Sequence, residues 1–145
     1  MTASNIEVFN DLTGRILGKL YLEFPMPGLL KAVDFVEPAS EWNEKCQMDM
    51  PSKEAEFFIA TAQWLVRAGY IHGEVRPYTH VSDVVLTAKG LEVLNAIPKS
   101  LVTGPSLGEQ LAEAAKEGGK ETLKGLVTEA LGLGARLFGP MIGVP

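Results

Sequence analysis

The sequence predicts a mainly helical α+β protein, and three observations carry this prediction. Between Ser52 and Ile97, a helical apolar pattern is followed by two short β-prone runs and a second helical pattern. Further apolar series at helical spacing begin after Ser4 and after Leu107. A chain of 145 residues with 46% hydrophobic residues can bury a substantial core. We therefore expect one domain over residues 1–100 and an amphipathic, glycine-rich helical tail over residues 101–145.

The first helix is predicted near residues 4–23. Ser4 and Glu7 have the spacing of a capping box directly before the apolar series. Gly14 and Gly18 lie inside this helix, where each glycine costs roughly 1 kcal/mol relative to alanine. Their spacing of four residues places both on one side of the helix. We therefore expect another segment to approach closely there, either from the same domain or from a partner in a groove.

A second, short helix is predicted near residues 27–36, because a proline suited to a first helical turn precedes an apolar stripe. We expect no core strand within the first fifty residues. Residues 37–52 are rich in turn formers but also contain Trp42, Met48 and Met50. We expect this segment to lie back on the core, with a ligand lid as the alternative.

A helix, a hairpin and another helix are predicted for the next part of the chain. Ser52 is the expected N-cap of a third helix near residues 53–68, and Gly69 stands where a left-handed C-cap glycine belongs. A hairpin near residues 70–86 follows, and Thr87 caps a fourth helix near residues 87–97.

Two stretches of this region resemble the winged helix-turn-helix superfamily. They are W-L-V-R-A-G-Y-I at the exit of the third helix and L-T-A-K-G-x-x-x-L after the hairpin. The resemblance covers about residues 6–98 and implies a winged-helix domain, with residues 53–68 as recognition helix and residues 70–86 as wing. The sequence departs from the family where residues 37–52 replace a tight turn, and the tail has no counterpart in the minimal fold.

The implied recognition helix and wing supply six candidate contacts with nucleic acid or a protein partner. On a helical wheel, Gln63 and Arg67 point outward, and such side chains pair with adenine and guanine. Glu54 and Glu56 at the start of the helix would repel phosphates. The six candidates are Lys53, Gln63, Arg67, Arg76, Tyr78 and His80.

Composition limits the classes of function. The net charge is −5, which argues against non-specific binding of nucleic acid through phosphate neutralisation. A single cysteine, Cys46, excludes an intrachain disulfide and fits a reducing compartment. The N-terminal residues lack the pattern of a signal peptide, and the uncharged runs are too short to span a bilayer. We expect a cytoplasmic protein without a membrane span.

The sequence contains no residue set that indicates an enzyme, a cofactor or a metal site. Residues 104–108 match the G-x-S-x-G pattern of a nucleophile elbow, but no histidine follows His80 to act as general base. The cysteine and histidines show no close ligand spacing. We expect no catalytic residue, no metal ligand, no cofactor and no small-molecule substrate.

The tail is predicted to be an association element. Gly118 with Gly119, and Gly132 with Gly134, should weaken or break its helix, so it should depend on contact for order. Glycines that repeat every seven residues from Gly118 fall on its polar side. Self-association as a homodimer through the tail is expected, and docking onto its own domain is the alternative. The proposed face comprises Leu123, Leu126, Ala130, Leu133 and Leu137.

Two functions follow from these patterns. The first is a non-catalytic winged-helix module that acts by association with proteins, including itself. The alternative is a winged-helix DNA-binding transcriptional regulator. The charge balance favours the first function, whereas the resemblance to the superfamily favours the second.

Overall fold

The first helix runs through the middle of the protein. The structure is a computed structural model that describes residues 4–76, 80–96 and 104–138. Within these residues the chain forms five α-helices, a short 3-10 helix and two small antiparallel sheets, which makes it a mixed α+β protein. In chain order the elements are α1 (Asn5–Glu23), β1 (Gly28–Lys31), η1 (Ala32–Asp34), β2 (Ser40–Asn43), β3 (Met48–Pro51), α2 (Lys53–Arg67), β4 (Ile71–Arg76), β5 (His80–Leu86), α3 (Ala88–Asn95), α4 (Leu107–Glu117) and α5 (Lys120–Phe138).

Side-chain caps start the helices where the sequence predicts them. The hydroxyl of Ser4 accepts a hydrogen bond from the Glu7 amide, that of Ser52 from Ala55 and that of Thr87 from Gly90. Helix α4 starts with a full capping box, in which Ser106 and Glu109 bond each other's backbone amides.

The predicted helix near residues 27–36 is wrong. This segment forms strand β1 and the short helix η1, and β1 pairs antiparallel with β5. Leu30 lies opposite Val81 in this pairing, and both side chains are fully buried. A core strand therefore occurs within the first fifty residues, contrary to the prediction. Pairing with a distant strand and burial of Leu30 outweigh the local helical pattern, because β-structure depends strongly on tertiary context.

The predicted hairpin near residues 70–86 is confirmed as β4 and β5. The three-stranded sheet has the order β1-β5-β4. Its inner face contributes Ile71, Val81, Val84 and Leu86 to the core. Val81 and Val84 are both buried although they are three positions apart, because the register shifts between them and Asp83 has a positive φ of 53°.

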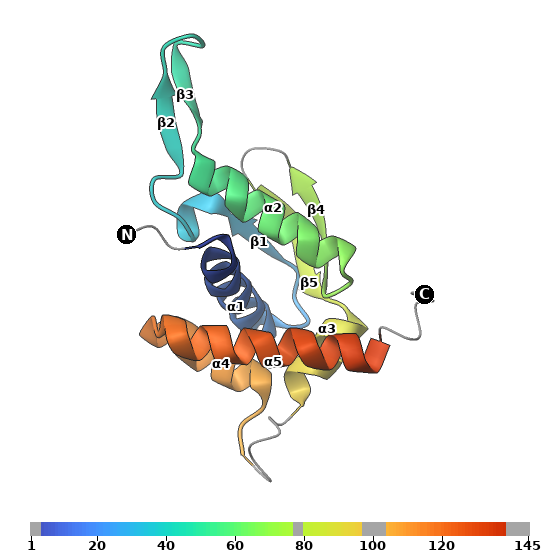
Figure 1. The fold of residues 1–145 in the computed structure, drawn as a ribbon. Coiled ribbons are helices and arrows are strands. Elements are labelled where there is room, and N and C mark those ends of the chain that lie inside the picture. Colours follow the sequence, from blue (N-terminus) through green and yellow to red (C-terminus); the bar gives the residue numbers. More distant parts are fainter. Residues whose placement is uncertain (1–3, 77–79, 97–103, 139–145) are drawn as a thin grey trace.

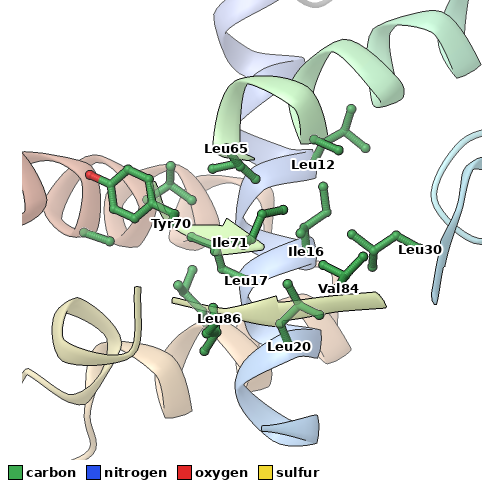
Figure 2. Packing of buried hydrophobic residues seen from close by; sticks show 14 of the residues in the cluster. Leu12, Ile16, Leu17, Leu20, Leu30, Leu65, Tyr70, Ile71, Val84 and Leu86 are labelled. Carbon is green, nitrogen blue, oxygen red and sulfur yellow. The ribbon is translucent and has the colours of Figure 1, made fainter. Parts of the chain in front are cut away.

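The core surrounds α1. Figure 2 shows Leu12, Ile16 and Leu20 along this helix, with side chains of the sheet and of α2 beside them. The opposite side of α1 contains the two glycines. A Cβ atom on Gly18 would lie 3.1 Å from backbone atoms of Ala112 in α4, and one on Gly14 would lie 2.8 Å from the Leu123 side chain in α5. The predicted close approach is confirmed, and the approaching segments belong to the same chain.

The tail forms α4 and α5, which lie against α1 (Figure 1). The predicted break at Gly118 and Gly119 is confirmed, with Gly118 in the left-handed conformation at φ 74°. A break at Gly132 and Gly134 is not observed, because α5 continues to Phe138. Gly125 and Gly132 face open space, as expected for the polar side.

The predicted association face requires correction. Leu123 and Ala130 are fully buried and Leu126 is 8% exposed, all three within the core of the same chain. Leu133 is partly buried against that core, and Leu137 is 42% exposed. Docking onto its own domain, the alternative left open by the sequence, therefore occupies most of this face. The sequence indicates that the apolar side of the tail must be buried, but it does not indicate which surface buries it.

Tyr70 fixes one end of α5 to the sheet. Its hydroxyl donates a hydrogen bond to the Leu131 carbonyl oxygen at 3.4 Å, and its ring stacks on Trp64 with centroids 6.4 Å apart. Gly134 lies against the same hydroxyl, where a Cβ atom would collide with it. Burial raises the pKa of the Tyr70 hydroxyl above its ordinary value, so this hydroxyl remains a hydrogen-bond donor.

Candidate functional site

A two-stranded hairpin, β2–β3, projects from the body of the protein (Figure 1). Its strands pair antiparallel with Ser40 opposite Pro51 and Trp42 opposite Asp49. The turn is closed by local side-chain bonds, since Asn43 Oδ1 accepts from the Cys46 amide at 3.0 Å. Residue Gln47 in this turn has a positive φ of 54°. The asparagine that the sequence indicates as a turn former thus builds the tip of a hairpin.

The expectation that residues 37–52 lie back on the core is wrong. Trp42 is 57% exposed and Met48 is 54% exposed, and both stand on the projecting strands. Large apolar side chains in a turn-rich segment suggested burial, but exposed apolar residues on a protruding element are typical of contact surfaces. The strand pairing was missed because β2 and β3 have only four residues each.

The hairpin is anchored at its base. The Ser52 amide donates to the Ala39 carbonyl oxygen at 3.1 Å, and the Ser52 hydroxyl donates to the Pro38 carbonyl oxygen. The same hydroxyl caps α2, so the end of β3 is tied directly to the start of a core helix. The hairpin is therefore held in place although its strands extend beyond the body.

Side-chain alternation gives the hairpin two different faces. Ser40, Trp42, Asp49 and Pro51 share one face, because paired residues of an antiparallel ladder point to the same side. We call this the Trp42 face. The opposite face carries Glu41, Asn43, Met48 and Met50.

A hollow of about 310 Å³ lies at the base of the hairpin. We call it the basal hollow. It is bounded by the base of β2–β3, by η1 and by the ends of β1 and β5. Most of its lining is apolar, with charged or polar groups at several points. Its lining residues are Lys31, Ala32, Val33, Ala39, Ser40, Asp49, Met50, Pro51 and His80.

The basic and acidic side chains of the basal hollow come from different elements. Lys31 and His80 are neighbours across the β1–β5 ladder, and Asp49 comes from the hairpin. Within the described part of the chain, the side chains of Lys31 and Asp49 form no ion pair or hydrogen bond. An ammonium and a carboxylate thus face an apolar hollow and are available to an incoming group.

The structure describes five of the six candidate contacts, and they come from three different elements. Lys53, Gln63 and Arg67 lie along α2, whereas Arg76 ends β4 and His80 starts β5 at the basal hollow. Tyr78 lies outside the described residues. Strand β4 runs beside α2 (Figure 1), with Arg67 as the last residue of α2 and Arg76 as the last residue of β4.

The charges around α2 are mixed. Arg76 forms an ion pair with Glu74 at 3.2 Å, and both side chains are more than half exposed. Glu54 and Glu56 are exposed in the first turn of α2, and Gln63 is only partly exposed. Trp64 is 45% exposed and contacts Phe9 edge-on, with ring centroids 5.3 Å apart. The described residues therefore do not present a continuous basic surface here.

Ser106 of the G-x-S-x-G segment has a role at the start of a helix. Its hydroxyl lies 3.2 Å from the Tyr21 hydroxyl and accepts from the Glu109 amide, and its side chain is nearly buried. Among residues 4–76, 80–96 and 104–138, no three histidine, cysteine, aspartate or glutamate side chains are grouped to hold a metal ion. The same residues contain no helix with the length and hydropathy needed to cross a membrane.

The combination that stands out is the projecting Trp42 face with the basal hollow beside it. Trp42 and His80 are both singled out by the sequence, but their proximity to one hollow is not, because it depends on the pairing of β1 with β5, which the sequence did not predict. Comparisons of the chain with protein-family models, with curated proteins and with solved structures give no match.

Proposed function

We propose that the protein is a non-catalytic module that acts by association with proteins, and that the β2–β3 hairpin is its contact element. The observation that supports this proposal is the exposure of Trp42 on a hairpin that is anchored but otherwise uncovered. Tryptophan is among the residues that contribute most to protein interfaces. An isolated two-stranded hairpin is marginally stable in water and gains stability when a partner covers it.

The winged-helix assignment forms part of this proposal. The order of α2, the β4–β5 hairpin and α3 agrees with the recognition helix, wing and following helix that the resemblance implies. The segment between α1 and α2 departs from that pattern, since β1, η1 and the β2–β3 hairpin occupy it. The additional hairpin gives this domain a surface that the minimal fold does not need.

DNA binding is the alternative function, and the exposed Arg67 on α2 supports it. Arginine side chains on such a helix can contact guanine. The acidic first turn of α2 and the pairing of Arg76 with Glu74 favour a protein partner over DNA. Protein association therefore remains the first proposal.

Site-specific photo-crosslinking in cells tests the proposed contact element. A benzophenone amino acid at position 42 should give a discrete crosslinked product, identified by mass spectrometry. The matched control places the same group at exposed Glu117, at the end of α4. The partner identified in that product, purified by itself, should bind the native chain and bind Trp42→Ala at least about tenfold more weakly, as expected for an interface hot spot. Identical products at both positions, or equal binding to both chains, contradicts the proposal.

A further inference from the structure

The Trp42 face carries a projection and a recess side by side. Trp42 lies directly opposite Asp49 in the ladder. Asp49, Ser40 and Pro51 of this face line the basal hollow, together with Met50 from the opposite face. A surface of this kind can match itself after a two-fold rotation, because each projection then meets the recess of the other copy. This self-complementarity favours the Trp42 side chain of a second copy as the group that fills the basal hollow.

The shape and polarity of the recess fit an aromatic ring. The hollow has a volume of about 310 Å³, which leaves room for one indole group. Its apolar walls come from Val33, Ala39 and Pro51 among others, and Val33 is 65% exposed in the single chain. Insertion of Trp42 would remove apolar surface from water on both sides of the contact.

The charges of this surface also match themselves. Lys31 and Asp49 both line the hollow, and neither has a side-chain partner within the described chain. In a two-fold arrangement, Lys31 of each copy can pair with Asp49 of the other, so the same contact forms twice. The hollow thus carries one side chain of each sign, Lys31 and Asp49, which is the arrangement that a two-fold exchange of ion pairs requires.

From these observations we infer that the protein forms a two-fold dimer in which Trp42 of each copy enters the basal hollow of the other. This inference rests on the proposed association function and specifies its partner. We expect a weak dimer, with a dissociation constant of roughly micromolar order, because the contact is built on one short hairpin whose strands have four residues each.

Sedimentation velocity on the full chain tests the dimer, over concentrations from about one to several hundred micromolar. The native chain should shift from monomer to dimer over this range. Trp42→Ala should weaken dimerisation at least tenfold, as expected for a central aromatic anchor. Met48→Ala is the matched control, because Met48 is similarly exposed but lies on the opposite face of the same hairpin. Circular dichroism establishes that each variant is folded.

A charge exchange tests the pairing directly. Lys31→Asp and Asp49→Lys should each weaken dimerisation, since each brings like charges together across the two-fold axis. The double variant should recover most of the native association, because it restores opposite charges. A native chain that stays monomeric, equal effects of Trp42→Ala and Met48→Ala, or a double variant as weak as the single ones overturns the dimer.

The tests of the dimer and of the proposed function give separable results. A monomeric native chain that still crosslinks from position 42 to a different protein overturns self-association and supports association with that protein. A monomeric chain without a specific crosslink from position 42 overturns both.

Discussion

The Thr13 side chain lies fully within the core, although its hydroxyl has no hydrogen-bond partner among the described residues. A buried hydroxyl without a partner loses its bonds to water and gains none in the protein, which costs free energy. Thr61 provides a contrast within the same core, because its hydroxyl donates to the Phe57 carbonyl oxygen at 2.9 Å. Chemically identical buried groups are thus expected to contribute differently to stability.

Replacing Thr13 with valine should therefore stabilise the protein. Valine has nearly the same shape, and the change removes the unsatisfied hydroxyl, so we expect a gain of about 1 kcal/mol in the free energy of unfolding. Thr61→Val is the matched control and should be neutral or destabilising, because it removes a hydrogen bond that is formed. Urea denaturation measures both, and a loss of stability in Thr13→Val would contradict the absence of a partner.

At the scale of elements, small residues set the distance between α1 and the tail helices. Gly18 allows the backbone of α4 to lie directly against α1, and Gly14 does the same for side chains of α5. Gly125 of α5 instead faces open space, so no packing reason for a glycine is visible there. A glycine inside a helix is therefore required for packing at position 18, whereas at position 125 it only lowers helix propensity.

Replacing each of these two glycines with valine should separate the effect of close packing from the effect of helix propensity. Gly18→Val should lower the free energy of unfolding by about 1–3 kcal/mol, because the new side chain must push α4 away from α1. Gly125→Val should leave stability unchanged or raise it slightly, since valine is a better helix former than glycine and meets nothing. Thermal and urea unfolding measure both variants. Equal destabilisation of the two would show that the contact of α1 with α4 is not as tight as described.

At the scale of the whole molecule, acidic residues outnumber basic ones. The chain has 13 basic and 18 acidic residues. The described candidate contacts come from α2, the end of β4 and the start of β5, and the same elements carry Glu54, Glu56 and Glu74. A basic stripe that follows a phosphate backbone is absent from the described surface of α2 and β4.

Random duplex DNA should accordingly bind poorly at physiological salt, and the affinity should depend only weakly on salt concentration. Fluorescence anisotropy with a labelled duplex measures both quantities. Arg67→Ala combined with Arg76→Ala is the informative variant, because these residues are the arginines among the candidate contacts. Tight binding with a steep salt slope that this double variant abolishes would place the DNA-binding function first.

Local sequence patterns determined the elements whose causes lie within a few residues. The caps at Ser4, Ser52 and Thr87 depend on a side chain and an amide three positions away, so they are visible in the sequence. The β4–β5 hairpin and the break at Gly118 are similarly local. The glycine spacing in α1 also predicted a close contact, because a helix of fixed period places residues four apart on one side.

Only the tertiary structure decided the features that depend on distant partners. Strand β1 exists because β5 lies beside it, and a helical pattern in residues 27–36 contains no information about that neighbour. The apolar side of the tail required a cover, but the choice between its own core and a second copy depends on the surface that α1 presents. The basal hollow joins residues from β1, η1, β2, β3 and β5, so its composition follows from the folded arrangement of these segments.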